Sequence, residues 1–191
     1  MRKLKLQVQI SVDGYVAGTN GELDWMTWKL DDKLIEFINS LTDSSDTILL
    51  GRKMTGGFVN YWEGVVNNQP DSREFSFAKK MVGTPKIVFS KTLNKSDWNN
   101  TTLAKGNLVE EITSLKKQKG KDLIVYGGAG FVSSLIKERL IDEFNFFVNP
   151  IMINKGMRIF DLLDKRQKLT FLNSVAYDCG ITVLSYKLNN N

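Results

Sequence analysis

Short apolar runs alternate with amphipathic segments along most of the chain. The apolar runs are rich in Val, Ile and aromatic residues, which favour β-strands. Strands are predicted at residues 5–10, 47–51, 86–90, 122–128, 143–152, 168–177 and 181–188. Between the earlier strands apolar residues recur with a helical period, which predicts helices at residues 31–41, 72–82, 106–118 and 130–140.

The order of these elements indicates the fold class. Strands that alternate with helices form a sheet covered by helices on both faces, a three-layer α/β/α arrangement. The last two strands meet at "DCG", residues 178–180, which is a typical hairpin turn. We therefore expect one α/β domain over residues 1–191, with a mixed, mostly parallel sheet and an antiparallel C-terminal hairpin.

The composition excludes several kinds of site. Apolar residues make up 42% and charged residues 25%, as in ordinary globular proteins, and no apolar run is long enough to span a membrane. The single cysteine, Cys179, excludes an internal disulfide and a cysteine cluster for a metal. Histidine is absent, so acid–base chemistry must use carboxylates, Lys, Tyr or water. We expect a cytoplasmic protein with no metal site and no membrane partner.

Positive charge is spread along the chain. The net charge is +5, and the densest basic run is "KKQKGK", residues 116–121. Cations are favourable at the C-terminal end of a helix, and this run falls at the end of a predicted helix. A nucleic-acid surface would instead combine clustered basic and aromatic residues. We therefore expect no nucleic-acid partner.

Three predicted strands end in residues suited to an anion. The stretches are "ILLGRKM" at 48–54, where two cations after the glycine open a short predicted helix, "IVFSKTL" at 87–93 and "IVYGGAGFVSSLI" at 124–136. Ligands of open α/β sheets bind beyond the carboxyl ends of the strands, so these Gly, Arg, Lys and Ser residues favour a nucleotide. The alternative for each glycine is a tight turn and nothing more. The third stretch is not a Rossmann fingerprint, because Ser133 stands where the last glycine is required.

Residues 11–32 form a long predicted loop between a strand and a helix. Such loops are usually lids, binding loops or disordered segments. Trp25 and Trp28 lie among aspartates, which suggests a flat aromatic wall for a substrate beside a carboxylate. The alternative is that the tryptophans pack on the core and Asp31 caps the helix. Asp13, in "SVDG", is interpreted first as a turn residue.

Four stretches, taken in order, resemble the dihydrofolate reductase superfamily. They are "QISVDGYVAG…GELDW", "ILLGRKM…YW", "KIVFSKTL" and "IVYGGAGFVSSLIKERLIDEFNFFVNPIMINKGMRIF". Within that superfamily they are most similar to the reductase domain of the bifunctional riboflavin-biosynthesis deaminase/reductase. The similarity extends over nearly the whole chain and implies the dihydrofolate-reductase-like fold.

The resemblance also implies a binding site for NADPH. In this superfamily the cofactor lies against a Gly-Arg turn after the second strand, a Ser turn after the next strand, and a Gly-Gly turn that opens a later helix. The matching residues are Gly51, Arg52 and Lys53 in the first turn, Ser90 and Lys91 in the second, and Gly127, Gly128, Ala129, Gly130 and Phe131 in the third. The glycines then let the backbone approach the cofactor, and a helix N-terminus faces its phosphates.

The residues expected to handle a proton depart from both relatives. Folate reductases carry an acid on the first helix; the ungapped match here is Lys33, with Asp32 one residue before it. The riboflavin-pathway reductase carries Lys at the position of Gln7 and Glu at the position of Tyr126. Asp32 and Tyr126 are the candidate catalytic residues, with water as the alternative. Asp32 qualifies only if it faces the cleft beside Trp28.

The activity implied by the resemblance is hydride transfer from NADPH to a small-molecule substrate, either a flat heterocycle (pterin- or pyrimidine-like) or a carbonyl. The alternative is a nucleotide-binding protein of the same fold with weak or lost reductase activity. The run "DEFNFFVNPIMI", residues 142–153, is apolar on both faces and predicts a homodimer interface, as is common in the nearest branch. The alternative for this run is a central strand.

Overall fold

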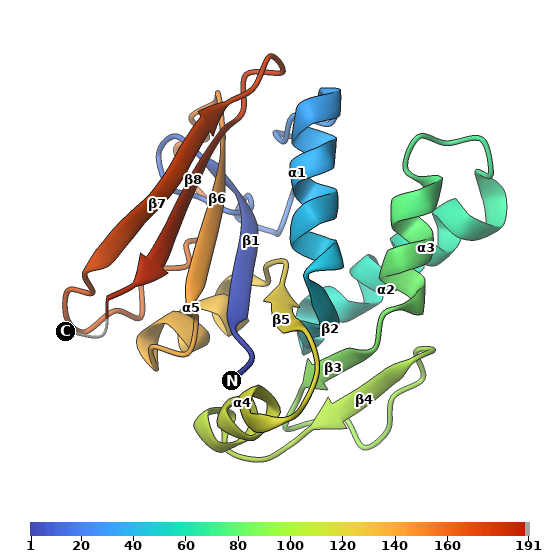
Figure 1. The fold of residues 1–191 in the computed structure, drawn as a ribbon, viewed down its shortest axis with the longest axis vertical. Coiled ribbons are helices and arrows are strands. Elements are labelled where there is room, and N and C mark those ends of the chain that lie inside the picture. The colour runs from blue at the N-terminus through green and yellow to red at the C-terminus, as the bar shows by residue number, and fades with distance from the viewer. Residues whose placement is uncertain (190–191) are drawn as a thin grey trace.

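The structure is a computed structural model that describes residues 1–189. Within this range the strands form one eight-stranded sheet in the order β4-β3-β2-β5-β1-β6-β8-β7 (Figure 1). β1 to β6 run parallel to one another, and β8 runs antiparallel to both β6 and β7. The strands are β1 Leu4–Ser11, β2 Ser45–Gly51, β3 Lys86–Phe89, β4 Thr101–Ala104, β5 Asp122–Val125, β6 Glu143–Asn149, β7 Leu169–Ala176 and β8 Thr182–Leu188.

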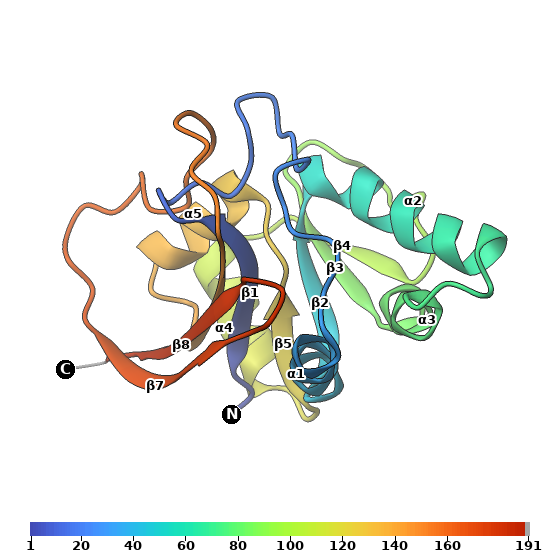
Figure 2. The same cartoon turned by 90° about the horizontal axis from the view of Figure 1, so that it is seen from above.

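Helices cover both faces of the sheet. They are α1 Asp32–Asp43, α2 Arg52–Asn68, α3 Phe75–Gly83, α4 Leu108–Lys117 and α5 Ala129–Lys137. α1, α2 and α3 pack on one face, where Leu34 and Met81 are buried; α4 and α5 pack on the other, with Ile112 and Leu135 (Figure 2). The predicted three-layer fold with an antiparallel C-terminal hairpin is therefore confirmed. No helix among residues 1–189 combines the length and apolar character needed to cross a membrane.

β1 lies near the centre of the sheet, between β5 and β6, and is buried on both faces. Leu4, Leu6, Val8 and Ile10 face the core beneath α4 and α5. Because side chains alternate along a strand, Lys5, Gln7 and Gln9 face the side that α1 covers. The central strand therefore carries polar side chains into the interior on one face.

Two elements differ from the sequence-based expectation. The sequence predicts only a short helix after Gly51, whereas α2 spans Arg52–Asn68, because Thr55, Val59 and Val65 are buried along one side of it. β4 is not predicted at all. It is a short strand at the edge of the sheet with only Ala104 buried, so its sequence carries little of the alternation that marks a strand.

Two surface expectations also change. β6 lies between β1 and β8, so the apolar run at 142–153 is largely a central strand, the alternative given for it above. In the basic run, Lys116 is buried; its Nζ donates to the Leu140 carbonyl at 2.7 Å and pairs with Asp142 at 2.5 Å. Part of the basic run therefore holds the fold together and does not form a solvent-facing charged surface. The homodimer itself stays a prediction.

Candidate active site

The predicted binding residues follow the carboxyl ends of the parallel strands. β1 and β5 are neighbours, but the chain leaves β1 toward β2 and leaves β5 toward β6, in opposite directions across the sheet. Such a switch point opens a crevice beyond the strand ends, which is where ligands of α/β proteins bind. The turn at Gly127 and Gly128 follows β5, and the loop 12–31 follows β1. Both therefore lie beyond the strand ends at this switch point.

The turn after β2 packs directly on the turn that opens α5. A Cβ built on Gly51 would lie 2.7 Å from Phe131 Cβ, a contact that real Cβ atoms do not make. The Phe131 ring in turn stacks on Phe89, the last residue of β3, with ring centroids 4.9 Å apart. The predicted cofactor turns after β2, β3 and β5 thus come together. Gly51 also has a purely structural reason to be glycine.

The Gly-Gly turn has glycine geometry and opens an uncapped helix. Gly127 and Gly128 have φ values of 143° and 85°, and a Cβ on Gly128 would lie 3.7 Å from Met54 in the first turn of α2. Asp31 caps α1 and Asn107 caps α4, but α2 and α5 have no side-chain cap. α3 also lacks one, although it does not follow a strand. The first N–H groups of α2 and α5 therefore stay available to an anion.

Three cationic side chains lie at these turns. Arg52, Lys53 and Lys91 are exposed, and none of their side chains forms a hydrogen bond or ion pair within residues 1–189. Ser90 is buried, and its Oγ accepts two backbone N–H groups of its own turn at 3.0 and 3.2 Å. Ser90 thus shapes the turn that presents Lys91. The structure leaves unpaired positive charge where the resemblance places cofactor phosphates.

A buried amide fastens the long N-terminal loop to the sheet. Asn149, the last residue of β6, is fully buried; its Oδ1 accepts the Thr27 N–H at 2.8 Å, and its Nδ2 donates to Gln9 Oε1 at 2.7 Å. Asn149 is not among the site residues predicted from the sequence. The available indication was a polar residue at the end of an otherwise apolar run. Asn149 positions the part of the loop that carries the tryptophans.

Asp13 joins the same loop to the connection between β6 and β7. Its carboxylate accepts Ser11 Oγ at 2.6 Å, Asn154 N–H at 2.8 Å and Ile153 N–H at 3.2 Å. These bonds, the Ser11 hydroxyl foremost, lower the pKa of Asp13 below its ordinary value. The interpretation of Asp13 as a turn residue is confirmed. The residue also holds a second segment far along the chain.

The two loops touch again beyond Asp13. Met157 N–H donates to the Ala17 carbonyl at 2.8 Å, and Val16 N–H donates to the Met157 carbonyl at 2.9 Å. A Cβ on Gly156 would lie 2.1 Å from the Ala17 oxygen, so only glycine fits. The loop after β1 and the loop after β6 are therefore clamped together at several points.

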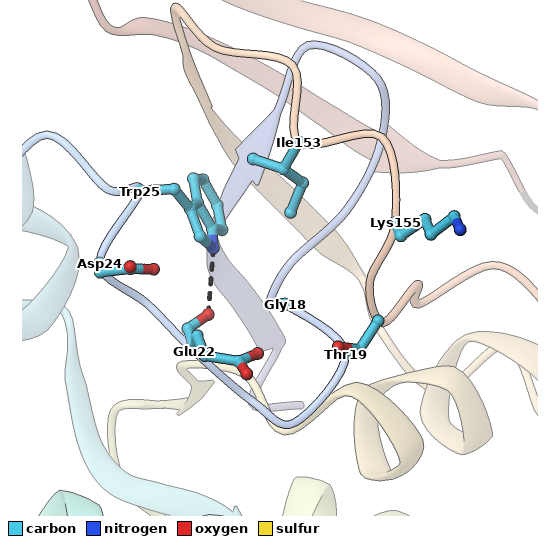
Figure 3. Close-up of a pocket in the computed structure, with 7 residues that line it drawn as sticks. All are labelled: Gly18, Thr19, Glu22, Asp24, Trp25, Ile153 and Lys155. Atoms are coloured by element: carbon cyan, nitrogen blue, oxygen red, sulfur yellow. Dashed lines mark hydrogen bonds between the residues drawn. The ribbon is translucent and has the colours of Figure 1, made fainter.

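A pocket of about 390 Å³ lies between these clamped loops (Figure 3). Its walls are formed by Gly18, Thr19, Glu22, Asp24, Trp25, Ile153 and Lys155. Trp25 Nε1 donates to the Glu22 carbonyl at 3.1 Å, which fixes the indole, and the Lys155 amine points away from it. Trp25 thus lines a pocket that also carries carboxylates. Trp28 is 59% exposed and does not line it.

Asp31 and Asp32 have different surroundings at the start of α1. Asp31 caps the helix through Leu34 N–H at 3.0 Å and accepts Cys179 N–H at 3.2 Å, and these bonds, the Leu34 amide first, lower its pKa. Asp32 is 84% exposed in its side chain and pairs with Arg73. Lys33 is also exposed. Asp32 therefore does not meet the condition set for a proton-handling carboxylate in the cleft.

The Tyr126 phenol is engaged inside the protein. Its hydroxyl lies 3.0 Å from Thr42 Oγ1, which itself donates to the Ile38 carbonyl at 2.9 Å, so Tyr126 is the donor in the pair. Its ring stacks on Phe58, with centroids 5.8 Å apart. Burial raises the pKa of Tyr126 well above its ordinary value. The phenol proton is thus held by a neighbouring side chain.

The sheet order, the glycine turns and the switch point at β1 and β5 define a reductase-type fold. Solved structures share it. A Shewanella sp. PV-4 protein named for riboflavin biosynthesis has a TM-score of 0.73 and 23% identity, with both chains covered in full. The Thermotoga maritima diaminohydroxyphosphoribosylaminopyrimidine deaminase/5-amino-6-(5-phosphoribosylamino)uracil reductase has a TM-score of 0.66 and 16% identity, over 98% of this chain and 57% of that one. At these identities the likeness concerns the fold alone.

The sequence comparisons place the chain in a family. The model of the RibD C-terminal domain matches residues 2–183, so the chain belongs to the RibD C-terminal domain family. The Bacillus subtilis (strain 168) uncharacterized protein YyaP is 31% identical, over 98% of this chain and 96% of YyaP. The Corynebacterium ammoniagenes riboflavin biosynthesis protein RibD is 21% identical, over 78% of this chain but 43% of that protein. The predicted resemblance is confirmed.

Proposed function

We propose that this chain is an NADPH-dependent reductase that acts on a small flat heterocycle, pterin- or pyrimidine-like, or on a carbonyl compound. One observation carries the proposal: α2 and α5 begin without side-chain caps at adjacent glycine turns, beside three cations unpaired within residues 1–189. Anions are favoured at helix N-termini and near cations. The residues present therefore fit the phosphates of a dinucleotide.

In this proposal each group has a separate task. The backbone of the Gly127–Gly128 turn and the N-terminal N–H groups of α2 and α5 hold the phosphates, with Arg52 and Lys53 beside them. Lys91 binds the additional 2′-phosphate that distinguishes NADPH from NADH. The cofactor, when bound, supplies hydride chemistry. Trp25 offers a flat apolar surface to a ring, within a pocket whose walls are already fastened.

In this proposal water donates the proton that the substrate takes up along with the hydride. Asp32 faces solvent and Arg73, and the Tyr126 hydroxyl donates to Thr42, so neither is placed to deliver a proton to a substrate. Proton transfer from water is slower than transfer from a positioned acid. We therefore expect a modest turnover that is insensitive to Asp32→Asn.

The direct test is NADPH binding by calorimetry, followed by the loss of NADPH absorbance with a panel of dihydropterins, aminopyrimidines and small carbonyl compounds. The double variant Arg52→Gln/Lys53→Gln should bind NADPH more weakly. Lys95→Gln is the matched control, because Lys95 is already paired with Asp97 at 3.0 Å. Absence of NADPH binding in the wild type would refute the proposal.

The second candidate function is NADPH binding with weak or lost reductase activity. It is favoured by the placement of Asp32 and Tyr126, which leaves both candidate acids engaged elsewhere. The same experiment separates the two. Tight NADPH binding without consumption by any compound of the panel supports the second candidate, and consumption with one compound supports the reductase.

A further inference from the structure

The pocket between the two clamped loops has acidic walls. Three charged residues line it, namely Glu22, Asp24 and Lys155. The Lys155 amine points away from the Trp25 indole (Figure 3), so its positive charge lies outside the space beside that ring. The two carboxylates remain, and both belong to the same short stretch of chain as Trp25. A ligand on the indole therefore meets negative charge.

Neither carboxylate is neutralised by a cation of the chain. Glu22 accepts the Asn20 backbone N–H at 2.9 Å and the Asn20 side-chain amide at 2.7 Å. Hydrogen bonds from its own backbone N–H and from Asn20 lower the pKa of Glu22, so it stays ionised. The Asp24 side chain forms no hydrogen bond or ion pair within residues 1–189. The negative charge of both residues therefore remains available to a ligand.

A third carboxylate lies behind one wall of the pocket. Asp13 accepts the backbone N–H of Ile153, a lining residue, at 3.2 Å, and it has no Lys or Arg partner in the described part of the chain. The chain as a whole has a net charge of +5, and its unpaired cations Arg52, Lys53 and Lys91 follow β2 and β3. Positive charge at the proposed cofactor turns and negative charge at this pocket thus belong to different loops.

The indole adds a second attraction for a cation. The face of a Trp ring is negative and attracts a positive charge placed over it. The Trp25 N–H is already donated to the Glu22 carbonyl at 3.1 Å, so a ligand is offered the ring surface and not the N–H. At about 390 Å³ the pocket is within the size range of small-molecule sites. Its size and walls suit a flat ring rather than a bare metal ion.

We propose that Glu22, Asp24 and Trp25 make this pocket select a flat ring that carries a positive charge, such as an amidinium or a protonated ring nitrogen, and reject an anionic ring. The inference deepens the proposed function and rests on it, since it names the charge of the substrate of that same site. The cation gains from the carboxylates and from the indole face, whereas an anion is repelled by the same carboxylates.

The first measurement compares three flat ligands of nearly equal size by ligand-observed NMR titration. Benzamidine is positive, benzamide is neutral and benzoate is negative at neutral pH. The wild type should bind benzamidine about three- to tenfold more tightly than benzamide, as an exposed ion pair and a cation–π contact together provide, and should bind benzoate most weakly. The preference should fall as salt is added, because exposed charges are screened.

The second measurement repeats the titrations on variants. Asp24→Asn should reduce the preference for benzamidine over benzamide, and the double variant Glu22→Gln/Asp24→Asn should abolish it, with benzamide affinity unchanged in both. Asp71→Asn is the matched control and should keep the preference. Asp71 is also exposed and unpaired within residues 1–189, but it lies between α2 and α3 and does not line the pocket.

Two results would overturn the inference. One is a wild type that binds benzamide or benzoate as tightly as benzamidine. The other is a preference that survives in Glu22→Gln/Asp24→Asn, which would place the cation elsewhere on the protein. NADPH titrations of the same samples keep the two proposals apart. NADPH binding without a benzamidine preference refutes the charge selection alone, and a benzamidine preference without NADPH binding refutes the proposed function and leaves the cation site standing.

Discussion

Gly51 and Phe131 are in contact so close that position 51 has no room for a side chain. A Cβ at Gly51 would lie 2.7 Å from Phe131 Cβ, and Phe131 is held by its stacking on Phe89. Gly51→Ala should therefore destabilise the protein by about 1–3 kcal/mol, the usual cost of overpacking a fixed site. Chemical denaturation gives this free energy of unfolding directly.

Gly57 is the control for that substitution. It lies within α2, and a Cβ there would meet no atom within 4 Å. Gly57→Ala should stabilise the protein by about 0.5–1 kcal/mol, because alanine favours a helix over glycine. A destabilising Gly57→Ala, or a neutral Gly51→Ala, would contradict the packing described for this turn.

Lys91 should decide the choice of cofactor. It is exposed and unpaired within residues 1–189, next to the Ser90 turn. We expect the wild type to bind NADPH at least about tenfold more tightly than NADH, since one charge-assisted hydrogen bond is worth roughly 1.5–3 kcal/mol. Lys91→Gln should remove most of this preference and leave NADH affinity unchanged. Calorimetric titration with both cofactors checks it; equal wild-type affinities contradict it.

The two aspartates that start α1 should respond differently to mutation. Asp31→Ala should lower the unfolding midpoint, because it removes the acceptor for both Leu34 and Cys179. Asp32→Ala should change the free energy of unfolding by less than about 1 kcal/mol, as expected for an exposed ion pair. Unfolding of both variants at neutral pH measures the difference, and equal effects would argue against the cap.

The effect of Asp31→Ala should also depend on pH. The folded pKa of Asp31 lies below its ordinary value of 3.8, so its carboxylate stabilises the folded state fully above that value. The contribution is lost as the pH falls from 3.8 through the lower folded pKa. Wild type and Asp31→Ala should thus converge in acid, and a gap that persists there would assign the effect to something other than the charge.

The sheet edge at β7 is where we expect a homodimer to form. β7 has only β8 as a neighbour, and Phe171 on it is 59% exposed. An antiparallel pairing of two β7 strands about a two-fold axis would bring the basic start of one, at Lys168, toward the acidic turn after the other, at Asp178. Unpaired edge strands favour such association.

Light scattering at micromolar concentration should therefore give a dimer mass for the wild type and a monomer mass for Phe171→Lys. Val109→Lys is the control, because Val109 is also an exposed apolar residue, at 38%, but lies on α4. A monomeric wild type, or a dimer that survives Phe171→Lys, would rule out this edge.

Most of the fold could be predicted because its strands carry strong local patterns. The apolar run before Gly51 and the "DCG" turn identify β2 and the hairpin without further information. β4 could not be predicted in the same way. It is a four-residue edge strand, and its pairing with β3 is set by tertiary packing rather than by its own residues.

The turns of the candidate site could be predicted from the sequence, but the partners of its side chains could not. Glycines and cations at strand ends are visible in the sequence, whereas the side chains that each residue meets are not. Asn149 and the hydrogen bonds of Asp13 join segments far apart in the chain. The same holds for Tyr126, whose proton is engaged by Thr42 on α1. Side-chain partners of this kind follow from the three-dimensional packing, which local periodicity does not encode.

The clamp between the loop after β1 and the loop after β6 has a consequence for folding. β1 is made first, but its neighbours β5 and β6 come after residue 121, and Asp13 finds its partners only at Ile153 and Asn154. Long-range contacts of this kind slow folding, because distant segments must meet before they stabilise each other. We therefore expect the loop 12–31 to take its fixed shape during synthesis only after residue 157 has emerged, and a chain truncated before that point should leave the central strand exposed to aggregation.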